Sequence, residues 1–188
     1  MDYVVVGLGN PGKEYDNTRH NVGYRAIDIL CERNSVSLSK ETPSTLSATI
    51  RINEKKVLLV RTTSYMNDSG VGIGEIVRRY KIEPEQLIIL QDELDLEFGV
   101  VKIKKGGGLA GHNGLRSINQ HIKSTDFLRV RIGVDKPSHK SQGADHVLRK
   151  MSAKENEIAD IACAQAADAV EMIVGDSLDK AMLVTHSL

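Results

Sequence analysis

The segment Tyr3-Val4-Val5-Val6-Gly7-Leu8-Gly9-Asn10-Pro11-Gly12 decides the fold, because it places a short apolar strand directly before a glycine-rich turn. Three consecutive valines are typical of a strand that is buried on both faces. Apolar residues with helical spacing follow at Val22, Ala26, Ile29 and Leu30. A buried strand followed by a helix is the usual beginning of an α/β domain.

The alternation of strands and helices continues through the rest of the chain. Further strands are expected at residues 46–52, 56–60, 87–90, 100–104 and 128–134, with a hairpin turn at Asn53-Glu54. Helices are expected after a cap at Asp68 or Ser69, at 115–122, and at 155–174 before Gly175. The order predicts an α/β fold: a single three-layer α/β/α domain over residues 1–188, with a mixed, mostly parallel twisted sheet.

Length and composition favour an ordinary globular protein. The 188 residues are 40% hydrophobic, and no apolar run reaches the roughly 20 residues that span a bilayer. The N-terminus has no basic leader, so we expect no signal peptide and a cytoplasmic location. Cys31 and Cys163 lie in apolar helical patterns, which indicates buried thiols. No apolar stripe remains for a partner, so a monomer without an obligate protein partner is expected.

The formal net charge of zero conceals an uneven distribution. Residues 100–150 contain eleven Lys or Arg and three Asp or Glu, a net +8, whereas the other 137 residues carry 14 against 22. A basic segment of this kind favours an anionic partner such as nucleic acid. A solvated surface that is balanced elsewhere would have the same composition.

The glycine-rich turn has the spacing of a dinucleotide-binding loop, Gly-x-Gly-x-x-Gly. Pro11 stiffens this loop, and the helical pattern starts only near Thr18, so the helix N-terminus that would bind phosphate is displaced from the glycines. Asp28 and Glu32, about twenty residues on, lie inside a helix rather than after a strand. The sequence therefore argues against nucleotide binding.

His20 is the best candidate for a catalytic base. It lies in the polar run Thr18-Arg19-His20-Asn21, and Asp92 follows a buried strand, where its carboxylate can orient an imidazole. A His–Asp pair without an activated Ser or Cys nearby predicts that water is the nucleophile. Three loop asparagines have amides suited to a peptide-like substrate and an oxyanion: Asn10, Asn67 and Asn113.

Five separated blocks resemble the bacterial-type peptidyl-tRNA hydrolase family. They are Val5-Val6-Gly7-Leu8-Gly9-Asn10-Pro11-Gly12-Lys13-Glu14-Tyr15, Thr18-Arg19-His20-Asn21-Val22-Gly23, Tyr65-Met66-Asn67-Asp68-Ser69-Gly70, Asp92-Glu93-Leu94-Asp95-Leu96, and Gly106-Gly107-Gly108 with Gly111-His112-Asn113-Gly114-Leu115. The resemblance extends from the first strand to the final helix. The resemblance implies hydrolysis of the ester that joins a peptidyl group to the terminal ribose of tRNA.

The resemblance also implies roles for individual residues. His20 is expected to be the catalytic base and Asp92 its orienting partner. Substrate and oxyanion contacts are expected from Asn10, Asn67 and Asn113, and pocket residues at Tyr15, Asn21, Tyr65 and Met66. The family's basic residues near the tRNA 5′ phosphate and acceptor stem match Lys102, Lys104 and Arg131. The expected partner is peptidyl-tRNA, through its acceptor stem, 5′ phosphate and CCA end.

Two local segments depart from the pattern of the family. Arg61-Thr62-Thr63-Ser64 lacks the proline common before the Tyr-Met-Asn block, and Leu109-Ala110 replaces His or Ser followed by Gly.

His112 is expected to support the loop around Asn113. No cofactor and no metal are expected, because the histidines show no metal-ligand spacing. Two alternatives are a non-catalytic RNA-binding protein on the same scaffold, and a hydrolase of small esters or amides, against which the basic segment argues.

Overall fold

The computed structural model describes residues 1–139 and 142–188. Its strands are β1 (Tyr3–Gly7), β2 (Ser39–Thr42), β3 (Thr45–Ile52), β4 (Lys55–Thr62), β5 (Leu87–Glu93), β6 (Val101–Lys105) and β7 (Leu128–Gly133). Its α-helices are α1 (Val22–Arg33), α2 (Ser69–Tyr80), α3 (Asn113–Ile122), α4 (Gly143–Leu148), α5 (Ala153–Gly175) and α6 (Leu178–Thr185). Short 3₁₀ turns are η1 (Lys13–Tyr15), η2 (Arg19–Asn21), η3 (Met66–Asp68) and η4 (Pro84–Gln86).

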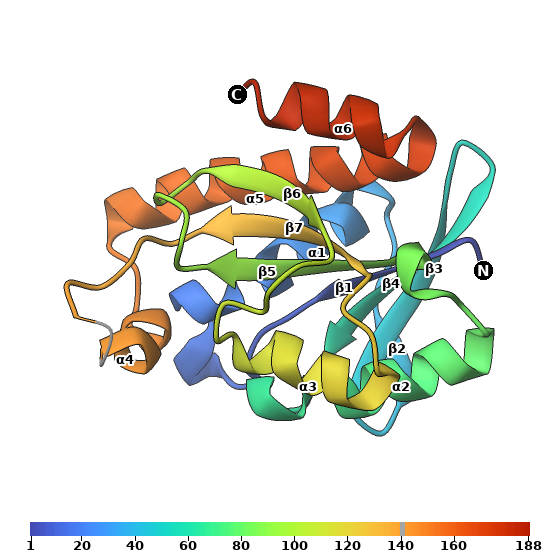
Figure 1. Cartoon of the computed structure of the whole chain (residues 1–188), viewed down its shortest axis with the longest axis horizontal. Coiled ribbons are helices and arrows are strands. Elements are labelled where there is room, and N and C mark those ends of the chain that lie inside the picture. The colour runs from blue at the N-terminus through green and yellow to red at the C-terminus, as the bar shows by residue number, and fades with distance from the viewer. Residues whose placement is uncertain (140–141) are drawn as a thin grey trace.

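In the described residues the strands form one seven-stranded mixed sheet in the order β2-β3-β4-β1-β5-β7-β6. The central strands β4, β1, β5 and β7 are parallel, and the antiparallel pairs β2–β3, β3–β4 and β6–β7 form the two edges. Helices cover both faces, with α5 and α6 on one side and α2 and α3 on the other (Figure 1). The predicted α/β fold with three layers is confirmed.

The central strands are buried because both of their faces contact helices. Every residue of β5 is buried, as are Val4, Val5 and Val6 of β1. Val5 contributes to the core shared with α1 and α5, whereas Val4 and Val6 contribute to the core on the α2 and α3 side. This arrangement explains why β1 and β5 have continuous apolar runs instead of alternating polarity.

Three local features differ from the sequence-based expectation or were missing from it. Asp68 occupies the N-cap position of α2, as predicted, but its side chain makes no capping hydrogen bond, and Ser69 Oγ donates to the carbonyl of Met66. The turn η3 leads directly into α2 and replaces the cap. The edge strand β2 and the short helix α4 were not predicted, because neither has a clear apolar period.

Ser177 is the N-cap residue of α6 and accepts a hydrogen bond from the backbone N–H of Lys180. Cys31 and Cys163 are free buried thiols, and burial raises the pKa of Cys163 to about 12. Among the described helices, none combines the length and the apolar character needed to cross a membrane.

Helix α1 begins in direct backbone contact with the carboxyl ends of β1 and β5. A Cβ atom at Gly23 would meet the carbonyl oxygen of Leu90 and would lie 2.6 Å from the carbonyl oxygen of Leu8. A Cβ atom at Gly7 would meet the carbonyl oxygen of Gly23. Glycine at both positions therefore brings the start of α1, and the turn η2 before it, to the end of β5.

Replacing Gly23 by alanine should destabilise the protein, because the atoms in the way belong to backbone. We expect Gly23→Ala to lower the free energy of unfolding by about 3 kcal/mol, as measured by chemical denaturation. Gly143→Ala is the control, since its Cβ would lie 3.8 Å from Leu94 Cδ1 and should change stability by less than about 0.5 kcal/mol. Equal stability of both variants would contradict the close-approach argument.

Candidate active site

Asp92 is the central residue of the candidate site. It lies in β5 near the carboxyl end of the strand, and its side chain is almost completely buried. His20 comes from the turn η2 before α1, and His112 is the N-cap residue of α3. The site therefore combines three segments that are far apart in the sequence.

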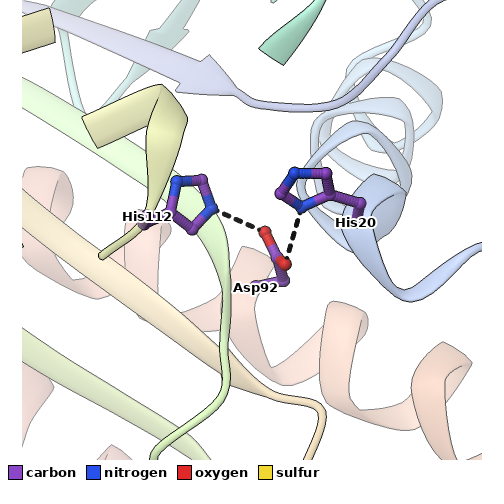
Figure 2. Close-up of side chains that lie close together, drawn as sticks. All are labelled: His20, Asp92 and His112. Atoms are coloured by element: carbon purple, nitrogen blue, oxygen red, sulfur yellow. Dashed lines mark hydrogen bonds and ion pairs between the residues drawn. The ribbon is translucent and has the colours of Figure 1, made fainter. Parts of the chain in front are cut away.

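The Asp92 carboxylate lies between two imidazoles (Figure 2). Its Oδ2 is 2.8 Å from Nδ1 of His20, and its Oδ1 is 2.7 Å from Nε2 of His112. Nδ1 of His112 accepts hydrogen bonds from the backbone N–H groups of Gly114 and Leu115. His112 therefore carries its proton on Nε2 and donates it to Asp92.

The contacts of His112 agree with its expected role as a support for the loop around Asn113. They fix the first turn of α3, whose first residue is Asn113. The contact between His112 and Asp92 was missed in the sequence, because nothing in the local pattern of either segment indicates that α3 begins beside the end of β5.

Electrostatics favour a charged Asp92 and a protonatable His20. Burial alone would lower the pKa of His20, but the charge of Asp92 and the hydrogen bond to it outweigh burial and raise this pKa. Burial alone would raise the pKa of Asp92, whereas the two imidazoles hold it well below its usual range. Asp92 therefore stays ionised at neutral pH and stabilises the imidazolium form of His20.

A cavity of about 570 Å³ lies beside this pair. His20, Asp92 and Asn113 contribute to its lining, together with Ala144 and Val147 of α4. Nδ1 of His20 is held by Asp92, and Nε2 has no hydrogen-bond partner among the described residues. The arrangement leaves one nitrogen of a buried, oriented imidazole available for proton transfer.

Asn10 is held by two other predicted site residues. Its backbone N–H donates to Oδ1 of Asn21 at 2.8 Å, and Nδ2 of Asn21 donates to its carbonyl at 2.9 Å. The N–H of Met66 donates to Oδ1 of Asn10 at 2.7 Å. The side-chain oxygen of Asn10 is thus engaged, which leaves its NH₂ group as a fixed donor. Both polar atoms of the Asn21 side chain thus contact the backbone of Asn10.

The remaining predicted substrate contacts do not all line the cavity. The rings of Tyr15 and Tyr65 meet edge to face, with centroids 6.3 Å apart. Asn67 in η3 and Asn113 in α3 are both exposed. Among the described residues that line the cavity with His20, Asn113 is present and Asn67 is absent.

The predicted phosphate-binding residues lie on one face of the β6–β7 edge. Lys102 is paired with Arg131 across the two strands, and Lys104 with Arg129, so all four side chains share a face. The side chain of Lys104 packs against Gly107, where a Cβ atom would meet its Cε. Gly107 has a φ of 88°, a backbone conformation that favours glycine.

Sequence reasoning missed Arg129. Its side chain is 2% exposed, and its guanidinium donates to the carbonyl of Gly108 at 2.8 Å. It thereby fastens the glycine-rich loop beside Lys104. The alternation of Arg129 and Arg131 along an otherwise apolar strand was a signal for this residue, since both must lie on the same face.

His20, Asp92 and His112 also form a group whose potential metal-ligating atoms lie within 4.8 Å of one another. Their N···O separations of 2.7 and 2.8 Å are shorter than the roughly 3.3 Å between ligand atoms around a tetrahedral zinc ion. Nδ1 of His112 is already an acceptor, which makes its Nε2 a donor. The geometry fits hydrogen bonds better than metal ligation.

Known proteins resemble this chain over almost its whole length. The profile of the family described as peptidyl-tRNA hydrolase matches residues 4–187. Peptidyl-tRNA hydrolase of Nocardia farcinica is 42% identical over 185 residues, 97% of this chain and 95% of that protein. That of Francisella tularensis subsp. holarctica is 41% identical, over 98% and 97%. The crystal structure of the Acinetobacter baumannii peptidyl-tRNA hydrolase has a TM-score of 0.90 at 38% identity, over 96% and 92%.

Replacing Asp92 by asparagine tests the electrostatics of the pair. Asp92→Asn removes the negative charge but leaves His20 buried, so we expect the pKa of His20 to fall below the ordinary value of about 6.5. An NMR titration of the His20 imidazole measures the shift. Asp95→Asn is the control, because Asp95 is exposed and paired with Lys136. An unchanged pKa in Asp92→Asn would contradict the coupling.

Proposed function

The chain belongs to the peptidyl-tRNA hydrolase family, and from this premise we propose that His20 and Asp92 are its catalytic pair. Its activity is the hydrolysis of peptidyl-tRNA, which releases tRNA. The proposal concerns how the residues of this chain perform that reaction. It depends chiefly on one observation: Asp92 holds Nδ1 of a buried His20 at 2.8 Å, while Nε2 has no partner in the described residues.

In the proposed mechanism, Nε2 of His20 takes a proton from a water molecule as that water attacks the ester carbonyl carbon. The carbonyl π electrons move to oxygen and form a tetrahedral oxyanion. When the C–O bond to the ribose breaks, His20 returns the proton to the leaving oxygen. The products are a peptide with a free carboxyl group and tRNA with a free terminal hydroxyl.

Asp92 supports both proton transfers without changing its own protonation state. Its charge stabilises the imidazolium that forms when His20 accepts the proton, and its hydrogen bond keeps Nε2 as the basic nitrogen. The pKa of Asp92 is far below its usual range, so the carboxylate does not compete for the proton.

The asparagines would bind the substrate and the oxyanion. The NH₂ group of Asn10 is the best-supported oxyanion donor, because Met66 fixes the orientation of the amide. Asn113 lines the cavity beside His20 and is a second candidate donor. We assign Asn67, Tyr15 and Tyr65 to contacts with the peptidyl group, and Asn21 and Met66 to the support of Asn10.

Lys102, Lys104 and Arg131 would bind phosphates of the tRNA acceptor stem and its 5′ end. Their shared face and the loop at Gly107 support this assignment. Binding through phosphates should weaken steeply with salt, because bound tRNA releases condensed counterions. We also propose that the protein acts in the cytoplasm as a monomer.

Replacing His20 by alanine should separate chemistry from binding. We expect His20→Ala to lower kcat by about 10³-fold or more, with little change in tRNA binding. Release of peptide from N-blocked aminoacyl-tRNA measures kcat, with free aminoacyl-tRNA as the substrate control. Lys104→Ala should show the opposite split, a higher KM with kcat retained. A near-native rate in His20→Ala would overturn the base assignment.

Replacing Asn10 by aspartate tests the oxyanion donor. Asn10→Asp retains an oxygen to accept from Met66 but loses the NH₂ group, so kcat should fall by about 100-fold. Asn119→Asp introduces the same charge on α3 away from the cavity lining and serves as the control in the same assay. Equal rates for both variants would assign Asn10 a purely structural role.

A further inference from the structure

Arg19, the neighbour of His20, binds a distant segment of the chain. Its side chain is 9% exposed, and its Nη2 donates to Oε2 of Glu155 at 2.7 Å. Its Nη1 contacts the carbonyls of Arg149 at 3.2 Å and His146 at 3.4 Å. The guanidinium thus joins the turn that carries His20 to the end of α4 and the start of α5.

Arg19 contacts two groups of acceptors, the carbonyls at the end of α4 and the carboxylate of Glu155. The carbonyls of His146 and Arg149 lie at the end of α4, where a cation is favourable, and that of His146 also accepts from the backbone N–H of Arg149. Glu155 belongs to the capping box of α5, in which its Oε1 accepts from the backbone N–H of Ser152. One arginine therefore satisfies two groups of acceptors that belong to different helices.

Other contacts near Arg19 also hold α4 in place. The N–H of Met151 donates to the carbonyl of Asn17 at 2.8 Å, and Thr18 forms an isolated antiparallel bridge with Lys150. Nε2 of His146 donates to the carbonyl of Val134, just after β7. α4 is consequently held from two sides, by residues 17–19 and by the end of β7.

α4 contributes a wall of the cavity that contains His20. Gly143, Ala144 and Val147 line this cavity, which also contains Asp92 and Asn113. Figure 1 shows α4 beyond the carboxyl ends of β5 and β7, apart from the other helices. A helix of six residues is too short to be stable alone, so its position depends on its tethers.

We propose that Arg19 is a positioning residue that holds α4 as a wall of the substrate cavity and thereby lowers KM for peptidyl-tRNA. The proposal rests on the proposed function, because the cavity is taken as the place where substrate binds. Arg19 acts through α4 and leaves the proton transfer to His20 and Asp92. Its planar fork reaches Glu155 and two carbonyls at once, which the single ammonium group of a lysine does not match.

Steady-state kinetics with N-blocked aminoacyl-tRNA test this role. Arg19→Gln should raise KM by about tenfold with kcat within about threefold of native, because it removes binding that is shared by ground and transition states. Arg19→Lys should give an intermediate KM. The acidic limb of the kcat profile against pH should stay in place, since the His20–Asp92 pair is intact. Arg33→Gln is the matched control, because Arg33 also pairs with acidic residues of α5.

Hydrogen exchange gives a readout that does not depend on activity. In Arg19→Gln, amides of residues 144–151 should exchange faster, whereas those of β5 should keep their native rates. Glu155→Gln keeps the arginine and removes only its charged partner, so it should cause a smaller change in the same direction. This variant also covers the case in which Arg19→Gln does not fold.

Two results would overturn the proposal: native exchange at 144–151 in both variants, or an unchanged KM in folded Arg19→Gln. An unchanged KM together with a shifted acidic limb would mean that Arg19 acts on the pKa of His20. Failure of the proposed function looks different, since the native protein itself would then release no peptide, while the exchange comparison would still report on α4.

Discussion

The close approach of α1 to the sheet is the constraint on which the site depends. At Gly7 and Gly23 no side chain separates the start of the helix from the carboxyl ends of β1 and β5. The turn before the helix therefore lies within hydrogen-bonding distance of the end of β5, and His20 reaches Asp92. A side chain at either glycine would move the helix outward. The imidazole would then lose the carboxylate that orients it.

Asp92 determines the electrostatics of the site. Each of its carboxylate oxygens accepts one imidazole N–H, so a buried charge is fully engaged where water cannot screen it. The second imidazole, His112, also fixes the first turn of α3 and with it Asn113. One carboxylate thus sets the orientation of His20 and links it to the segment that carries a predicted substrate contact.

The basic face and the cavity are built by different parts of the sheet. The cavity lies at the carboxyl ends of the parallel strands, whereas Lys102, Lys104 and Arg131 occupy one face of the antiparallel β6–β7 edge. Arg129 is buried beneath the glycine-rich loop and fixes it through Gly108. This separation suits a substrate with two chemical parts, since phosphates would then meet the cationic side chains and an ester would meet the His20–Asp92 pair.

Local sequence determined the α/β alternation, the buried central strands, and the choice of His20 and Asp92 as candidate site residues, because apolar periodicity and polar residues after strands are encoded within short segments. It did not indicate β2 or α4, which are short and depend on contacts with distant residues. Only the tertiary structure decided that Asp92 holds two imidazoles and that Arg19 reaches Glu155. Such partners lie tens to more than a hundred residues apart, and chain packing alone brings them together.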